Sequence, residues 1–219
     1  MYNIILLPLI TVSAIITIIA DVRNNSVLRA IFKPLTTVLI LLIAVTALPN
    51  SGNSVYIMII AGGLFLSLIG DIALLKQKAE QAFLIGLIAF LTAHILYSIA
   101  FYMTRPFVQQ DIIVTVAVAL VALVIYGVLY KGLAAMKVPV LVYTLIIGFM
   151  LSRAIVMLTG GVPFNQALLT AIGALLFFTS DMLLAFDRFK KPIPANGYYI
   201  LSTYYIGQTL IALSVHFMK

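Results

Sequence analysis

Residues 55–75 read VYIMIIAGGLFLSLIGDIALL, an apolar run whose one charged side chain is Asp71. About 20 apolar residues in a helix cross the hydrocarbon core of a bilayer, so this run predicts a membrane-spanning helix. A carboxylate inside hydrocarbon costs ~2.5 kcal/mol or more and is rare unless it has a function. Residues 180–185 (SDMLLA) repeat the arrangement, with Asp181 near the end of another apolar run. Two of the six acidic residues therefore occupy matching positions.

Composition extends this interpretation to the whole chain. Of 219 residues, 64% are hydrophobic and 9% are charged, whereas a soluble domain carries about 25% charged residues. The apolar runs are long and lack the alternation of an outer-membrane barrel, so the class is a helical integral membrane protein. The chain has no cysteine, which excludes disulfides and thiolate catalysis.

The apolar runs predict an all-α membrane protein with eight transmembrane helices. The connections between them are short, so the chain, 1–219, is expected to form a single polytopic membrane domain. The expected spans are roughly 2–20, 33–48, 55–75, 82–103, 111–130, 138–158, 164–186 and 197–217.

Basic residues gather in alternate connections and predict the orientation. The even-numbered connections carry only Arg105, while ten of the thirteen basic residues lie in or beside the odd-numbered ones: Arg23, Arg29, Lys33, Lys76, Lys78, Lys131, Lys137, Arg188, Lys190 and Lys191. By the positive-inside rule the odd-numbered connections are cytoplasmic and both termini lie outside. Asp71 and Asp181 then share one depth near the inner boundary. We expect a prokaryotic inner (plasma) membrane from the short connections.

Spacings recur between the two halves of the chain. His94 follows Asp71 by 23 residues, and Tyr204 follows Asp181 by 23 residues. Lys33 with Pro34 opens the expected second span, and Lys137 with Pro139, two residues later, opens the sixth. These matches favour two parallel four-helix repeats, 1–103 and 111–217, with a site between the halves. Because the similarity is short, coincidence is the alternative.

Other polar side chains fall inside the expected spans, where lipid offers them no partner, so we expect them to face a cavity in the bundle. These residues are Ser67 on the face of Asp71, His94 and Tyr97 on the fourth span, and Tyr204, Tyr205 and Gln208 on the last. Each has a structural alternative. The aspartates can cap a helix or pair with a lysine, the others can join helices, Lys33 can be an anchor at the inner face, and Arg153 can snorkel to the outer interface.

The inventory of residues excludes several catalytic classes. Two histidines without cysteine argue against a multi-histidine zinc hydrolase, and no H-E-x-x-H, G-x-S-x-G or P-loop sequence is present. What remains is a carboxylate pair with His, Tyr, Lys and Gln nearby. Two carboxylates in a low-dielectric pocket do not both stay ionised, so one holds a proton while the other is a base. That division suits hydrolysis through an oxocarbenium-like state.

Five segments, in their order and spacing, resemble the YhhN-type lysoplasmalogenase family over nearly the whole chain. They are 32–36 (FKPLT), 68–75 (LIGDIALL), 86–97 (GLIAFLTAHILY), 173–181 (GALLFFTSD) and 204–208 (YYIGQ). The resemblance implies an ether hydrolase that cleaves the vinyl ether bond of lysoplasmalogens. The products would be a fatty aldehyde and a glycerophospho-ethanolamine or -choline.

The resemblance also implies roles for the residues. One of Asp71 and Asp181 would be the acid and the other the base, and Lys33 would meet the substrate phosphate. The orienting residues would be Ser67, His94, Tyr97, Tyr204, Tyr205 and Gln208. The partners implied are an alkenyl lysophospholipid substrate, entering from the inner leaflet, and membrane lipids, with no metal, organic cofactor or nucleic acid.

Two other functions use the same residues. Intramembrane aspartates in duplicated halves also occur in a small proton- or cation-coupled membrane transporter. Both acids are expected near one face rather than at the midplane, which argues against transport. A binding or scaffold protein, whose polar groups only hold the bundle together, is the third reading.

Overall fold

The computed structural model describes residues 2–50, 54–76 and 79–218. Within these ranges the chain is all-helical, without strands, which confirms the predicted class. The long helices are α1 (Tyr2–Val22), α2 (Ser26–Val45), α3 (Ser54–Leu74), α4 (Glu80–Thr104), α5 (Asp111–Leu129), α6 (Lys137–Val156), α7 (Phe164–Phe189) and α8 (Asn196–Ser214). Their bounds follow the expected spans closely, except at the start of α2 and the end of α7.

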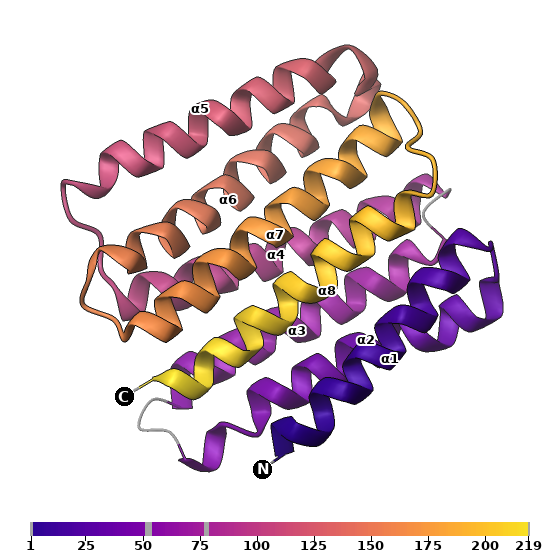
Figure 1. The fold of residues 1–219 in the computed structure, drawn as a ribbon. Helices are drawn as coiled ribbons and strands as arrows, with labels where there is room; N and C mark the ends of the chain where they lie inside the picture. Colours follow the sequence, from indigo (N-terminus) through magenta and orange to yellow (C-terminus); the bar gives the residue numbers. More distant parts are fainter. Residues whose placement is uncertain (1, 51–53, 77–78, 219) are drawn as a thin grey trace.

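Consecutive helices run antiparallel and pair as hairpins, α1 with α2, α3 with α4, α5 with α6, and α7 with α8 (Figure 1). Helix α4 also contacts α6, and α8 contacts α1 and α2, so the two halves of the chain pack against each other. Both termini lie at one end of the bundle. We call the other end, which holds the connections α1–α2, α3–α4, α5–α6 and α7–α8, the basic end.

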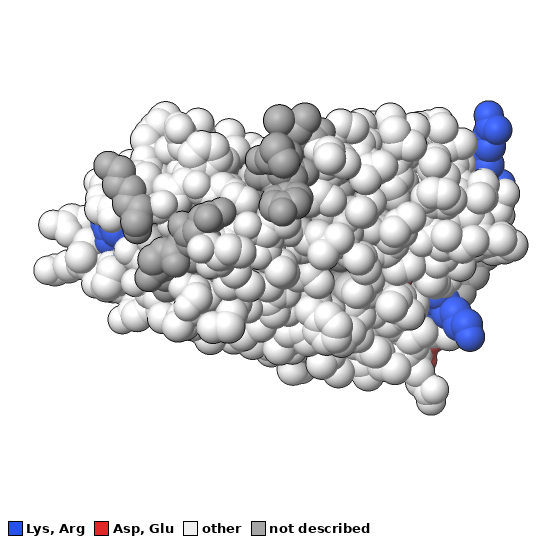
Figure 2. Space-filling view, turned by 90° about the horizontal axis from the view of Figure 1, so that it is seen from below, with Lys and Arg blue, Asp and Glu red and all other residues white. Residues whose placement is uncertain are grey.

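The protein is an integral, multi-pass membrane protein. In the described part of the chain, seven helices, α1 to α7, are long and apolar enough to cross a membrane. Helix α8 is outside this set because tyrosines, hydroxyls and Gln208 lower its hydropathy, although it lies within the bundle beside α7. Figure 2 shows one flank of the molecule, on which charged side chains appear only toward the two ends. Lys78, one of the predicted inner-face residues, lies outside the described residues.

The predicted start of the second span is wrong. The sequence placed it at residue 33, whereas α2 begins at Ser26, so Arg29, Lys33 and Pro34 lie inside the helix. Asn25 caps the helix by accepting a hydrogen bond from the amide of Leu28 at 3.0 Å. The helix therefore begins before its basic residues, so Arg29 and Lys33 are both helical. Lys33 consequently projects into the bundle instead of marking a helix end.

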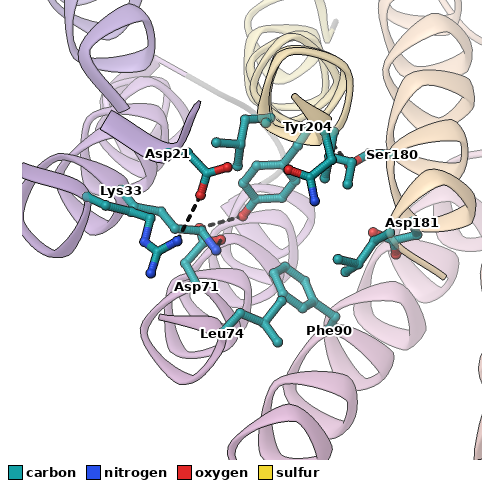
Figure 3. A pocket seen from close by; sticks show the side chains of 14 residues that line it. Asp21, Lys33, Asp71, Leu74, Phe90, Ser180, Asp181 and Tyr204 are labelled. Carbon is teal, nitrogen blue, oxygen red and sulfur yellow. Dashed lines mark hydrogen bonds and ion pairs between the residues drawn. The ribbon is translucent and has the colours of Figure 1, made fainter. Parts of the chain in front are cut away.

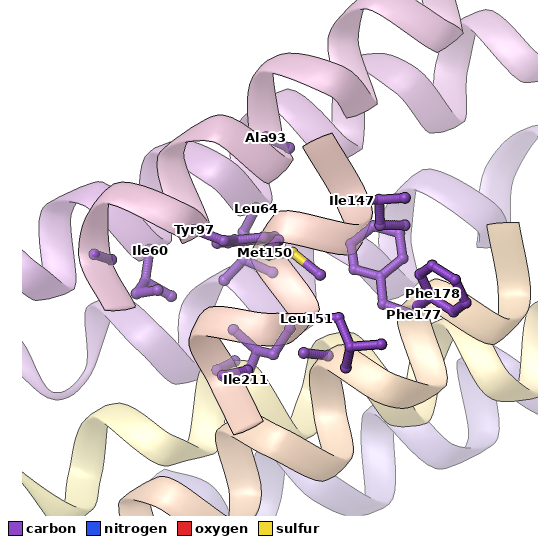
Figure 4. Packing of buried hydrophobic residues seen from close by; sticks show 14 of the residues in the cluster. Ile60, Leu64, Ala93, Tyr97, Ile147, Met150, Leu151, Phe177, Phe178 and Ile211 are labelled. Carbon is purple, nitrogen blue, oxygen red and sulfur yellow. The ribbon is translucent and has the colours of Figure 1, made fainter. Parts of the chain in front are cut away.

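The core is built from large side chains of α3, α4, α6 and α7. Tyr97, Met150 and Phe177 are inaccessible and interdigitate with aliphatic neighbours (Figure 4). Phe177 places its ring 4.7 Å from that of His94 and 5.4 Å from that of Tyr204, measured between centroids. Such edge-on aromatic contacts fix ring positions. The polar residues at the basic end are therefore supported by a rigid aromatic layer.

Helices α7 and α8 approach closely through two glycines. A Cβ atom on Gly173 would lie 2.8 Å from the carbonyl oxygen of Gly207, and one on Gly207 would lie 2.8 Å from that of Gly173. Small residues of this kind let membrane helices pack backbone to backbone. The contact fixes α8 against α7 and so sets the position of Tyr204 relative to Asp181.

The end of the bundle opposite the basic end holds a buried ion pair. Arg153 belongs to this pair, so the alternative in which it snorkels to the outer interface is wrong. Arg153 is inaccessible and its Nη1 lies 3.1 Å from Asp111 Oδ2. Arg105 Nη1 lies 3.1 Å from the same oxygen, and Arg153 also donates to the Arg105 carbonyl. Asp111, at the start of α5, lowers the cost of burying Arg153, because a paired buried charge costs far less than a lone one.

Candidate active site

A pocket at the basic end contains both aspartates of the matched pair (Figure 3). The side chains around it come from six helices, α1 to α4, α7 and α8. The lining residues used below are Asp21 of α1, Arg29 and Lys33 of α2, Asp71 of α3, Asp181 of α7, and Asn196 and Tyr204 of α8. Its room for water-sized groups is about 50 Å³, which is enough for a few water molecules. Asp71 and Asp181 therefore lie at the same end of the bundle.

Asp71 is 1% exposed and is held by three side chains. Thr37 donates to its Oδ2 at 2.5 Å, and Tyr204 donates to the same oxygen at 2.7 Å. Lys33 Nζ lies 3.5 Å from Oδ1. Lys33 and Thr37 are one turn apart on α2, so the helix presents a cation and a hydroxyl together. This carboxyl therefore sits in an environment built for a negative charge.

Asp181 is 8% exposed and has a different set of neighbours. The hydroxyl of Tyr143, on α6, donates to its Oδ2. His94 Nε2 lies 3.6 Å from the same oxygen, beyond hydrogen-bond length, and neither ring nitrogen of His94 has a hydrogen-bond partner among the described residues. Within those residues no lysine or arginine pairs with Asp181. The two carboxyls thus differ in the charge that faces them.

The contacts cross between the two halves of the chain. His94 follows Asp71 in sequence but lies beside Asp181, whereas Tyr204 follows Asp181 but bonds Asp71. Within each half, the second helix supplies a hydroxyl to the aspartate of the third: Thr37 to Asp71, and Tyr143 to Asp181. His94 and Tyr204 thus each contact the aspartate of the other half, whereas Thr37 and Tyr143 each contact the aspartate of their own half.

Three of the predicted orienting residues form a separate chain behind the pocket. The hydroxyl of Tyr97 donates to Gln208 Oε1 at 2.9 Å, and Gln208 Nε2 donates to Ser67 Oγ at 2.9 Å. Ser67 in turn donates to the carbonyl of Gly63 at 3.0 Å. This chain ties α3, α4 and α8 together one turn beyond Asp71. Tyr205 lines a groove between α1 and α8 rather than the pocket.

The sequence analysis missed several residues of the site. Asp21 Oδ1 lies 3.1 Å from Arg29 Nη1, and both line the pocket. The sequence suggests that Arg29 lies in a connection, and it does not single out Asp21. The i, i+4 spacing of Lys33 and Thr37 was a usable signal, since such pairs share a helix face. Tyr143 gave no signal, because hydroxyls are common in membrane helices.

Close packing also shapes the pocket edge. A Cβ atom on Gly197, at the start of α8, would lie 2.5 Å from Asp21 Oδ2. A larger residue there would push α8 away from α1. Across the pocket, Ser180 donates to the carbonyl of Ile200 at 2.9 Å and joins α7 to the same part of α8. The start of α8 is therefore fixed from both sides.

Known proteins resemble the chain along most of its length. A sequence model described as the YhhN family matches residues 28–215. Lysoplasmalogenase TMEM86A of Bos taurus is 38% identical over 155 residues, which cover 69% of this chain and 62% of that protein. Lysoplasmalogenase TMEM86B of Homo sapiens is 35% identical over 166 residues, which cover 76% and 66%. The matches thus span about three-fifths to two-thirds of these mammalian relatives' length.

A bacterial relative matches nearly end to end. The protein named uncharacterized membrane protein YhhN, of Escherichia coli O157:H7, is 29% identical over 213 residues, which cover 94% of this chain and 96% of that protein. No solved structure matches the chain at a significant level.

Proposed function

Because the chain belongs to the YhhN family, and because two buried aspartates of unlike surroundings share one pocket, we propose that it is a membrane hydrolase of lysoplasmalogens. It cleaves the vinyl ether bond to give a fatty aldehyde and glycerophospho-ethanolamine or -choline. The observation that carries the proposal is the pair Asp71 and Asp181 on one pocket, where Asp71 has a cation partner and Asp181 has none among the described residues. The names of the mammalian relatives supply the substrate class.

The proposed reaction uses the two carboxyl groups in turn. A carboxyl proton adds to the β-carbon of the vinyl ether, which leaves an oxocarbenium ion at the α-carbon. Water adds to that carbon as the second carboxylate takes its proton. The hemiacetal then loses the glycerol oxygen and becomes the aldehyde. This division of work between a protonated and an ionised carboxyl is the general acid and base pattern.

The other residues of the pocket suit a phosphorylated glycerol. Arg29 and Lys33 supply positive charge for the substrate phosphate, and Asn196 adds an amide beside them. Tyr204 and His94 orient the two carboxyls, while Ser67, Tyr97, Tyr205 and Gln208 support α8 from behind. No metal or organic cofactor enters these steps.

The same proposal includes the membrane arrangement. Helix α8 is the eighth span, and its polar residues turn toward the bundle because lipid offers them no partner. The basic end is cytoplasmic and both termini lie outside, so the substrate enters from the inner leaflet of a prokaryotic plasma membrane. The crossed contacts of His94 and Tyr204 support two parallel repeats, 1–103 and 111–217.

The test is release of aldehyde by the purified protein in detergent, with alkenyl lysophosphatidylethanolamine as substrate. Asp71→Asn and Asp181→Asn are each expected to lower the rate at least a hundredfold. Glu80→Gln is the control: Glu80 is an exposed acid at the start of α4 and does not line the pocket. Full activity of both site variants would refute the proposal, and ion flux in liposomes without aldehyde release would favour a transporter.

A further inference from the structure

A second pocket lies on the other side of Asp181, among α3, α4, α6 and α7. Its wall is apolar over most of its area and includes Phe83, Leu87, Val140 and Met182. It is narrow, with about 30 Å³ of room for water-sized groups, so a hydrocarbon chain that enters displaces flexible side chains such as Leu87. We call it the apolar pocket, and the pocket with Asp71 the polar pocket.

The two pockets meet at one place. Four residues line both of them: Leu74, Phe90, Asp181 and Leu184. Asp181 is the one ionisable member of this shared wall. Asp71 lines the polar pocket and is absent from the wall of the apolar one. A ligand that is polar at one end and apolar at the other would therefore cross from one pocket to the other beside Asp181.

Four charged side chains of the polar pocket form two ion pairs, and Asp181 is the fifth ionisable side chain that the argument uses. Arg29 pairs with Asp21 at 3.1 Å, and Lys33 approaches Asp71 at 3.5 Å. Asp181 has no such cation in the described part of the chain, and its neighbours are a tyrosine hydroxyl and an imidazole. An uncompensated charge in a low-dielectric site is costly. The pocket is neutral as a whole when Asp181 carries a proton and Asp71 does not.

We propose that the apolar pocket binds the alkenyl chain of the substrate, and that Asp181 is consequently the proton donor while Asp71 is the base. This rests on the proposed hydrolysis of vinyl ethers. With the head group in the polar pocket and the chain in the apolar one, the vinyl ether lies at the shared wall. Its β-carbon, which bears the chain, faces the side of Asp181, and its α-carbon, which bears oxygen, faces the side of Asp71.

The steps balance in protons and electrons. The π electrons of the vinyl group form a C–H bond with the proton of Asp181, which becomes a carboxylate. Water forms a C–O bond to the α-carbon and gives one proton to Asp71. As the bond to the glycerol oxygen breaks, that oxygen takes the proton from Asp71, and the hemiacetal hydroxyl returns a proton to Asp181. One water is consumed and both carboxyls regain their starting states.

The chain site is tested at Leu87, which lines the apolar pocket but not the polar one. Leu87→Trp fills the pocket and is expected to lower kcat/KM for a hexadecenyl substrate at least about tenfold, while a butenyl substrate changes less than about twofold. Leu84→Trp is the matched control one turn earlier on α4, where Leu84 is 39% exposed on the outer surface. Leu87→Ala enlarges the pocket, is expected to favour the longer chain, and serves if the tryptophan variant does not fold.

The role of Asp181 is tested by rescue with azide, a small nucleophile that needs no base. Azide is expected to restore turnover to Asp71→Asn, with an azido adduct at the α-carbon, but not to Asp181→Asn, which lacks the proton donor. Rescue of Asp181→Asn, or of neither variant, would overturn the assignment.

If wild-type protein releases aldehyde but the chain-length profile of both Leu87 variants matches wild type, the chain site is wrong while the proposed function stands. If wild type releases none, the proposed function itself fails.

Discussion

Removing the Lys33 ammonium should destabilise the protein chiefly through the charge it leaves behind on Asp71. The two groups are 3.5 Å apart, and the Lys33 side chain is 10% exposed, so solvent screens the pair weakly. At an effective dielectric constant of about 20, two unit charges at this separation attract by about 5 kcal/mol. Lys33→Met, which keeps the length of the side chain, is expected to cost about 3 kcal/mol. The cost is below the full attraction because Asp71 keeps its bonds from Thr37 and Tyr204.

A double-mutant cycle separates the pair from the loss of packing. Asp71→Asn in the Lys33→Met background removes the uncompensated charge, so the double variant should be more stable than the sum of the single losses by about 2 kcal/mol. Lys137→Met, at the start of α6, is the control. The Lys137 ammonium lies 4.4 Å from the centre of the Tyr130 ring, a contact that contributes at most about 1 kcal/mol.

Unfolding can be followed by far-ultraviolet circular dichroism as a denaturing detergent is added to protein in a mild one. Helical signal is the appropriate probe because the chain contains no tryptophan. A coupling between Lys33 and Asp71 smaller than about 0.5 kcal/mol would be typical of independent sites. That result would mean that Lys33 does not neutralise Asp71, and it would remove the charge argument that distinguishes the two aspartates.

Two further predictions concern the framework of the site. Tyr143→Phe removes the hydroxyl that donates to Asp181. Because a hydrogen bond to a charged group contributes about 1.5 kcal/mol or more, aldehyde release should fall about tenfold or more as Asp181 becomes ionised, and the free energy of unfolding should fall by about 1 kcal/mol. Gly207→Ala places a methyl group 2.8 Å from the carbonyl oxygen of Gly173, and by separating α7 from α8 it should lower stability by about 1–3 kcal/mol. Gly127→Ala, with no heavy atom within 4 Å of the new methyl group, should be neutral or slightly stabilising in the same denaturation assay.

The aspartate pair could be found from sequence because the physics of the bilayer singles it out. Charges are rare within spans, so two carboxyls in matching apolar runs are conspicuous without any knowledge of packing. Their shared depth followed from helix direction alone. The partner Tyr143 was not predictable, because hydroxyls occur throughout membrane helices and their role depends on how each helix is rotated. For Thr37 the spacing of four residues from Lys33 was the one available signal. Helix rotation is set by contacts between distant segments, which a single sequence does not display.

The prediction was wrong at the start of α2, where polar residues suggested the end of a membrane-spanning helix. Arg29 and Lys33 suggested a connection because charges seldom lie in hydrocarbon, yet both residue types form helices readily. Each gained a carboxylate partner from another helix, Asp21 and Asp71 respectively. Arg153, for which snorkelling to the outer interface was one alternative, is likewise paired with an acid, Asp111. A cation inside a span marks an interface when an acid elsewhere in the chain is available to pair with it.

The crossed pairing of His94 and Tyr204 explains why neither half of the chain would suffice. If each of these residues had stayed beside the aspartate of its own half, each aspartate would depend on contacts within one half only. The exchange instead joins α4 to α7 and α8 to α3, so both aspartates reach one pocket only when the halves are together. The two aspartates also differ in the partners that their own halves supply: Asp71 faces Lys33 and Thr37, and Asp181 faces Tyr143. A symmetric pair of carboxyls would share one proton equally, whereas this asymmetric pair assigns the proton to one side, as ordered proton donation and water activation require.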